Sequence, residues 1–143
     1  MKRIAVVRIR GRVGIRRDIR ETLDFLRLYR KNYCVVLPAT DSIIGMVKKI
    51  GSYVTWGEID DETFKLLVEK RGEPYKGRES DSKGKIKYGR KYFVFDGKKY
   101  KPYFRLNNPR GGFGRKGIKV PFSVGGGAGY RGEKINDLIR RML

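Results

Sequence analysis

The stretch Arg8-Ile-Arg-Gly-Arg-Val-Gly-Ile-Arg-Arg-Asp-Ile-Arg20 takes the chain from an apolar segment, through a basic loop, into an amphipathic helix. It contains six arginines and one acid, so its charges repel one another. Such a cluster is stable when the arginines point outward from a core made elsewhere and an anion meets them. The stretch therefore predicts a modest apolar core that presents a surface to a polyanion.

The residues on either side of the basic loop predict a strand and a helix. The segment from Ile4 to Ile9 is apolar on both faces at its centre, which indicates an inner strand. A helix is expected over about residues 17–29, where Asp18 and Glu21 resemble a capping box. Its apolar stripe has helical spacing and consists of Ile19, Leu23 and Leu26.

The next residues repeat this alternation. Strands are predicted over 33–37, before Pro38, and over 53–56. Between them Thr40 suits the N-cap of a helix, and Gly51 suits the left-handed position that stops one. Residues 1–57 are therefore predicted to form a β-α-β-α-β module of the α+β class, with both helices on one face of a small sheet.

Residues 58–143 are predicted to form a loop-rich C-terminal extension, in which 14 of the 19 glycines lie between Gly72 and Gly132. The charged stretch from Glu73 to Lys87 has few large apolar residues, so we expect a loop that is mobile or that becomes ordered with a partner. Aspartate followed by glycine favours a type I′ hairpin turn at Asp96-Gly97. The expected elements are a helix over about 60–72 that begins at Asp60 or Asp61, a basic loop over 73–91, a hairpin over about 92–104, a glycine-rich segment over 105–132 and a helix over about 133–142.

The charge distribution indicates a nucleic-acid partner. The net charge is +20, with +9 on residues 1–57, −2 on residues 58–72 and +13 on residues 73–143. Lysines and arginines clustered in this way are typical of nucleic-acid binding. A protein of the membrane surface would place them opposite the apolar face of an amphipathic helix, whereas most of them here lie in predicted loops.

The sequence also indicates a compartment. The single cysteine, Cys34, lies in an apolar run and is expected to be an inert core residue. No intramolecular disulfide can form, which fits a reducing environment. We find no signal peptide and no apolar run close to the roughly 18 residues of a membrane span. A cytoplasmic protein with no membrane partner is expected.

The arginine-rich loop is the first candidate site. The nine residues before Asp18 contain no acid, whereas an ordinary solvated surface mixes both signs. Guanidinium groups pair bidentately with phosphate oxygens without reading sequence. The basic end of the helix would extend this footprint, although cations also favour a helix C-terminus for its dipole alone. The predicted RNA contacts here are Arg8, Arg10, Arg12, Arg16, Arg17, Arg30 and Lys31.

The segment 105–119 is the second candidate site. Its glycines would let the backbone approach RNA closely, and its one aromatic ring could stack on an unpaired base. The alternative is a solvent loop whose ring folds back onto the core. The predicted contacts are Arg105, Asn107, Arg110, Phe113, Arg115, Lys116 and Lys119.

The segment Gly127-Ala-Gly-Tyr-Arg-Gly132 matches a dinucleotide fingerprint, but the eleven residues after it cannot supply the second strand and the acid that such a site needs. We retain only an anion site at a helix N-terminus, with Arg131 beside it.

The sequence offers few candidate catalytic residues. The chain has no histidine, and Asp60 and Asp61 fit better as charges at the start of a helix. We expect no enzyme, no metal and no cofactor.

Several long motifs resemble the L-thirty family of large-subunit ribosomal proteins, in the archaeal type that is related to eukaryotic L-seven. In the first half these are Arg8 to Leu23, Leu26 to Asn32 and Tyr53 to Gly57. In the second half they are Phe104 to Asn107, Arg110 to Phe113 and Gly129 to Arg140, which resemble that type's C-terminal extension. The resemblance covers the chain apart from residues 73–91.

The resemblance implies a split, ferredoxin-like module and a non-catalytic role on large-subunit ribosomal RNA. The loop around Arg10 to Arg17 and the segment around Arg105 to Lys119 would contact that RNA. It further implies neighbouring ribosomal proteins as partners, with 5S ribosomal RNA as an additional candidate. No small-molecule substrate and no homo-oligomer are expected. The alternative function is a free RNA chaperone or a chromatin-like nucleic-acid binder.

Overall fold

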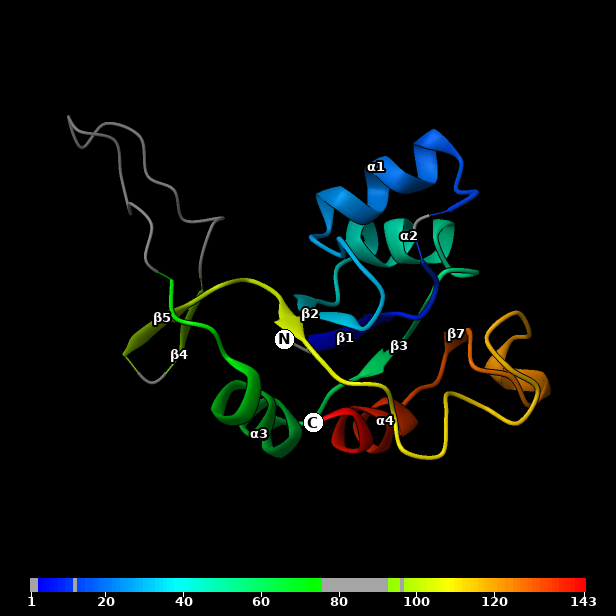
Figure 1. Cartoon of the computed structure of the whole chain (residues 1–143). Helices are drawn as coiled ribbons and strands as arrows, with labels where there is room; N and C mark the ends of the chain where they lie inside the picture. The colour runs from blue at the N-terminus through cyan, green and yellow to red at the C-terminus, as the bar shows by residue number, and fades with distance from the viewer. Residues whose placement is uncertain (1–2, 12, 76–92, 96) are drawn as a thin grey trace.

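The computed structural model describes residues 3–11, 13–75, 93–95 and 97–143, and Figure 1 shows the path of the chain. The elements of the first half are β1 (Arg3–Arg8), α1 (Arg17–Phe25), β2 (Tyr33–Pro38), α2 (Asp41–Lys49), β3 (Val54–Glu58) and α3 (Asp61–Arg71). Those of the second half are β4 (Phe93–Phe95), β5 (Lys98–Tyr100), β6 (Phe104–Arg105), η2 (Phe122–Val124), β7 (Gly129–Tyr130) and α4 (Lys134–Met142).

A five-stranded sheet of order β6-β2-β1-β3-β7 forms the centre of the molecule. The predicted inner strand is confirmed, since β1 pairs antiparallel with β2 and with β3, and Val6 lies opposite both Val35 and Trp56. Each side of this strand must be covered, because its side chains alternate between the two faces. The predicted β-α-β-α-β order of the first 57 residues is also confirmed.

Each face of the sheet carries two helices (Figure 1). On one face Ile4 and Val6 pack with the buried side chains of α1 and α2, as the sequence predicts. On the other face Ala5 and Val7 pack with those of α3 and α4. Helices from the C-terminal part of the chain therefore complete the core of the N-terminal module. Cys34 is fully buried in this second cluster, and burial raises the pKa of its thiol to about 12.

The C-terminal part also supplies both edges of the sheet. Strand β6 pairs with the first residues of β2, and β7 runs parallel to β3. The predicted hairpin is confirmed in β4 and β5, where Phe95 lies opposite Lys98 and Gly97 has φ of 75°. Asp96 of its turn and residues 76–91 of the predicted basic loop lie outside the described residues.

Some predicted helix boundaries are wrong. Helix α1 ends at Phe25 rather than near residue 29, because Arg27 turns left-handed with φ of 67° and returns Leu28 to the core. Its N-cap is Arg16, so Asp18 lies inside the first turn and does not begin a capping box. Gly51 follows α2 without the predicted left-handed φ.

The predicted cap at Thr40 is confirmed, and of the two residues predicted to begin the next helix, Asp60 is its N-cap. The Thr40 hydroxyl accepts from the Ile43 amide at 3.4 Å, and the Asp60 carboxylate accepts from the Thr63 amide at 2.7 Å. Each cap satisfies an amide that has no partner inside its own helix. Gly72 follows α3 in an extended conformation and closes it as predicted.

Candidate nucleic-acid interface

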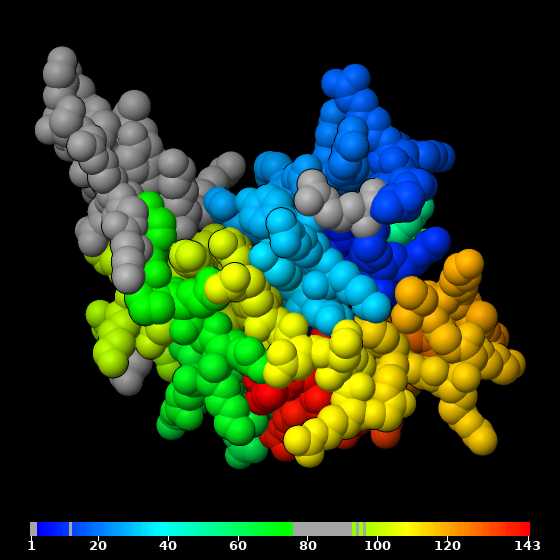
Figure 2. All heavy atoms as spheres, viewed as in Figure 1, coloured from blue at the N-terminus to red at the C-terminus, as the bar shows by residue number. Residues whose placement is uncertain are grey.

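The strand pairings place the predicted basic segments at one end of the sheet. Arg8 at the end of β1 lies opposite Val54 at the start of β3, and Tyr33 at the start of β2 lies opposite Arg105 at the end of β6. The loop after β1, the turn before β2 and the segment after β6 therefore meet. We name the cation-bearing segments 10–17, 30–31 and 105–119 the basic end. Figure 2 shows the light-blue surface before β2 bordered by the yellow surface after β6.

Asn32 connects these segments. Its amide donates to the Arg8 carbonyl at 2.7 Å, and its carbonyl accepts from the Leu106 amide at 3.1 Å. Its side-chain amide donates to the Asn108 side chain at 2.8 Å. The residue has φ of 69°, a region that asparagine enters more readily than most residues. The sequence analysis missed Asn32 as a contact point, and an asparagine between a helix and a strand was the available signal.

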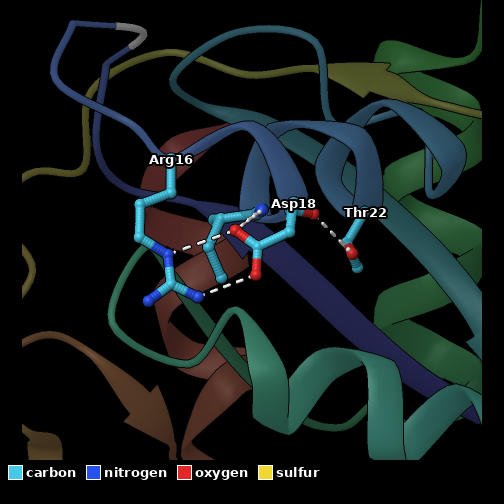
Figure 3. Close-up of polar contacts among 4 residues, drawn as sticks. Arg16, Asp18 and Thr22 are labelled. Carbon is cyan, nitrogen blue, oxygen red and sulfur yellow. Dashed lines mark hydrogen bonds and ion pairs between the residues drawn. The ribbon is translucent and has the colours of Figure 1, made fainter.

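The exposed Arg16 and Arg17 of the first loop form ion pairs with acidic side chains, which an RNA phosphate could replace. Arg16 forms a bidentate pair with Asp18, with nitrogen-oxygen distances of 3.1 and 2.7 Å (Figure 3). This hydrogen-bonded pair lowers the pKa of Asp18 and raises that of Arg16. Arg17 pairs with Glu21 at 3.0 Å. Exposed pairs of this kind contribute little to stability, so the guanidinium groups can exchange them for another anion.

Two further arginines of this loop were predicted to contact RNA. The Arg10 guanidinium lies over the Tyr53 ring, 4.8 Å from its centroid. The residue is half-buried. Arg12 lies outside the described residues.

Arg8 does not lie on the surface as predicted, because it is only 2% exposed. Its guanidinium donates to the carbonyls of Leu28 at 2.7 Å, Arg10 at 2.9 Å and Gly11 at 3.2 Å. Two of these carbonyls lie in the segment 10–17, and the third lies just before the segment 30–31. The Arg8 side chain therefore holds this loop from inside the protein. Because Arg8 is buried, its guanidinium is not exposed for contact with RNA.

The second basic segment is tied to the terminal helix. The Arg141 side chain donates to the carbonyls of Arg110 and Gly112, each at 2.8 Å. The Asn107 amide donates to the Met142 carbonyl at 3.0 Å. Several glycines here have positive φ, including Gly111, Gly112 and Gly117. These contacts fix the path of a segment that has little regular secondary structure.

Most predicted side chains of this segment are exposed. Arg105 lies beside Glu73, and this ion pair raises the pKa of the guanidinium. The remaining exposed side chains of the set are Asn107, Arg110, Arg115, Lys116 and Lys119. Arg30 and Lys31, before β2, are exposed as well.

Phe113 and Arg131 face the interior, contrary to the sequence prediction. Phe113 is 8% exposed and packs in the core beneath α3 and α4, so it is not presented to a base. Arg131 is 6% exposed and donates to the Thr55 hydroxyl and to the carbonyls of Phe113 and Gly127. Burial lowers the pKa of Arg131 to about 10. Its guanidinium joins the glycine-rich turns to β3 from inside the protein and is not exposed as the sequence prediction required.

Acidic side chains collect at the other end of the sheet, where Ile4 lies opposite Glu58. A hollow of about 930 Å³ there is lined by Glu58, Asp60, Asp61, Glu133 and Asp137, with Arg3 and Arg140 among them. Arg3 pairs with Asp61 at 2.5 Å. Within the described residues, the exposed arginines of the basic end and these acids therefore lie at opposite ends of the sheet.

The described part of the chain contains neither a candidate metal site nor a candidate membrane-spanning helix. No three histidine, cysteine or acidic side chains there are placed to hold a metal ion. No helix in those ranges is long and apolar enough to cross a membrane.

Comparison with known proteins gives one consistent family. Residues 4–54 match the family model described as Ribosomal protein L30p/L7e. Proteins named large ribosomal subunit protein uL30 are similar over nearly the whole chain. The one from Methanopyrus kandleri is 43% identical over 94% of this chain and 100% of its own length. Those from Nanoarchaeum equitans and Methanococcus vannielii are 44% and 45% identical, each over 97% of this chain and over 97% and 98% of their own lengths.

Proposed function

The chain belongs to the ribosomal protein L30p/L7e family, and from this premise we propose that its basic end binds large-subunit ribosomal RNA through arginine and lysine contacts to phosphates. As a family member it is a structural, non-enzymatic component of the large ribosomal subunit, of archaeal type, and acts in translation in the cytoplasm. Family membership favours this function over a free RNA chaperone or a chromatin-like protein.

The observation that carries the proposal is the separation of charge between the two ends of the sheet. Exposed cations from three separate segments converge at the basic end, while Asp60, Asp61 and Glu133 lie around the opposite hollow. A polyanion would be attracted to the first end and repelled from the second, so the field orients the protein before contact.

Contacts from two independent loops would let the protein bridge RNA segments. The loop 10–17 follows β1, whereas the segment 105–119 follows β6 and is held by Arg141. The first loop leaves the central strand of the sheet and the second leaves an edge strand of the same core, so each can meet a different stretch of backbone. We propose large-subunit ribosomal RNA for both contacts, with 5S ribosomal RNA as the candidate for one of them.

The salt dependence of binding tests the proposal. Replacing Arg10, Arg16 and Arg17 together by glutamine should weaken binding to purified large-subunit ribosomal RNA. It should also flatten the plot of log K against log[salt] by about 0.7 to 0.9 for each phosphate that the variant no longer neutralises. The matched control replaces three cations away from the basic end, Arg3, Lys65 and Arg140. Equal slopes for the two triple variants would exclude the loop from the interface.

Sedimentation supplies an independent check. In a sucrose gradient the unaltered protein should travel with the large subunit even in moderately high salt, because several contacts must break together. The Arg10, Arg16 and Arg17 variant should leave the subunit at lower salt than the control variant. Recovery of all three proteins in the light fractions at every salt concentration would contradict the proposed binding to large-subunit ribosomal RNA.

A further inference from the structure

Three tyrosines form a cluster beside the basic end. The proposed arginine and lysine contacts to phosphates give this cluster no role. The rings of Tyr33 and Tyr103 are stacked, with centroids 5.4 Å apart and planes at 5°. Tyr29 stands nearly perpendicular to both, at 5.8 Å from Tyr103 and 6.5 Å from Tyr33. Edge-to-face and offset-stacked rings are the favoured aromatic arrangements, so the cluster holds its own geometry.

The cluster is open to solvent on one side. Tyr29 is 37% exposed and lies in the turn between α1 and β2, outside both core clusters. Tyr33 and Tyr103 are half-buried and rest against the core beneath α1 and α2. Among the described residues, none of the three hydroxyls makes a hydrogen bond with another group. The cluster thus combines two rings fixed against the core, the more exposed ring of Tyr29, and hydroxyl groups that are available for hydrogen bonds.

Cations surround this surface. Arg30 and Lys31 follow Tyr29 directly and are exposed. Arg105 lies opposite Tyr33 in the strand register and therefore on the same face of the sheet. Glu73 pairs with this guanidinium and also with the Lys101 amine at 3.6 Å. Aromatic rings among exposed cations are the arrangement that binds unpaired nucleotides, because the rings stack on bases while the cations hold the phosphates.

We infer that the Tyr29, Tyr33 and Tyr103 cluster is a nucleotide-binding platform that receives an unpaired base of RNA, with Arg30, Lys31 and Arg105 around its phosphates. This inference rests on the proposed function, since the same RNA occupies the basic end. It adds a different kind of recognition, because phosphate contacts do not distinguish paired from unpaired RNA. It also supplies the aromatic contact that the sequence analysis assigned to Phe113, whose ring is buried.

The test uses Tyr29, because its ring lies outside the core and can be removed without opening a cavity. Binding is measured to two probes of equal length, oligouridylate and a fully paired RNA duplex. Tyr29→Ala should lower the ratio of single-strand to duplex affinity by about 5- to 100-fold. Tyr29→Phe should recover most of this decrease, since stacking needs the ring. An unchanged ratio in Tyr29→Ala would overturn the inference.

Phe25→Ala is the matched control, since Phe25 is an aromatic residue that is 63% exposed and outside the cluster. A decrease in this variant equal to that in Tyr29→Ala would indicate a general effect of surface aromatics and overturn the platform. Normal RNA binding by Tyr29→Ala together with poor incorporation into the subunit would assign the cluster to a protein partner instead.

The Arg10, Arg16 and Arg17 variant separates failure of the inference from failure of the proposed function. If it weakens binding to both probes while Tyr29→Ala leaves the ratio unchanged, only the platform is wrong. If neither variant alters binding to either probe, the basic end itself is not an RNA surface.

Discussion

Two arginines of this cationic chain lie inside it and act as structural donors. Arg8 joins carbonyls of Arg10, Gly11 and Leu28, and Arg131 joins Phe113, Gly127 and the Thr55 hydroxyl. The planar guanidinium carries five N–H donors in a fixed fork, which suits it to several carbonyls at once. Loops with little regular structure thereby gain hydrogen-bond donors for backbone carbonyls that no ladder of regular structure satisfies.

Replacing Arg8 should therefore destabilise the fold. Arg8→Met keeps much of the side-chain volume but leaves up to three carbonyls without donors, and each unpaired carbonyl costs about 1–3 kcal/mol when it is buried. We expect a decrease of about 2–4 kcal/mol in the free energy of unfolding, measured by urea titration. Arg16→Met is the control, since Arg16 is exposed. Equal stability of the two variants would show that Arg8 does not hold the loop.

At the scale of single elements, close backbone contacts join the edge strand and the terminal helix to the sheet. Gly57 in β3 lies against the backbone of Gly132, just before α4, and a Cβ at Gly57 would overlap the Gly132 carbonyl. Nearby, the Arg131 amide donates to the Trp56 carbonyl at 2.7 Å. The Tyr130 hydroxyl donates to the Glu58 carboxylate, and this bond raises the pKa of Tyr130.

Gly57→Ala should displace β7 and the start of α4, because the obstructing atoms are backbone and cannot rotate away. We expect an increase in the Trp56 emission wavelength and a decrease of several kcal/mol in unfolding free energy, within the range seen for overpacked sites. Gly11→Ala is the matched control, since no atom lies within 4 Å of a Cβ there and its φ is not positive. A native-like Gly57→Ala protein would contradict the close approach.

At the scale of the whole molecule, the sequence was informative where apolar periodicity was long. The inner strand, the helices and the caps at Thr40 and Asp60 follow from local patterns. Strands β6 and β7 could not be predicted, because two residues carry no periodic signal and pair with strands 70 or more positions away. The inward turn of Arg8 was equally hidden, since its buried hydrogen bond goes to the Leu28 carbonyl, 20 positions along the chain.

The candidate site was predicted in part for the same reason. A cluster of arginines indicates a surface for an anion, and the side chains of Arg16 and Arg17 are exposed. A run of glycines, however, does not show which side chain turns inward, so Phe113 and Arg131 were placed on the wrong side. The convergence of the basic segments depends on strand order, which is a property of the assembled sheet.

The shared core predicts that the chain unfolds as one unit, although its sequence divides at residues 57 and 58. Residues 1–57 alone would expose Ala5, Val7 and Ile9, which α3 and α4 cover in the full chain. Burial of apolar surface supplies most of the stability of a domain, so this fragment should show no cooperative transition.

In the full chain, Trp56 is 7% exposed and its ring lies 4.7 Å from that of Tyr130, so the fluorescence of Trp56 reports on both the N-terminal and the C-terminal part. Urea transitions followed by Trp56 fluorescence and by far-UV circular dichroism should coincide. A dichroism change at lower urea, with Trp56 still buried, would mean that the C-terminal helices leave a sheet that is stable without them.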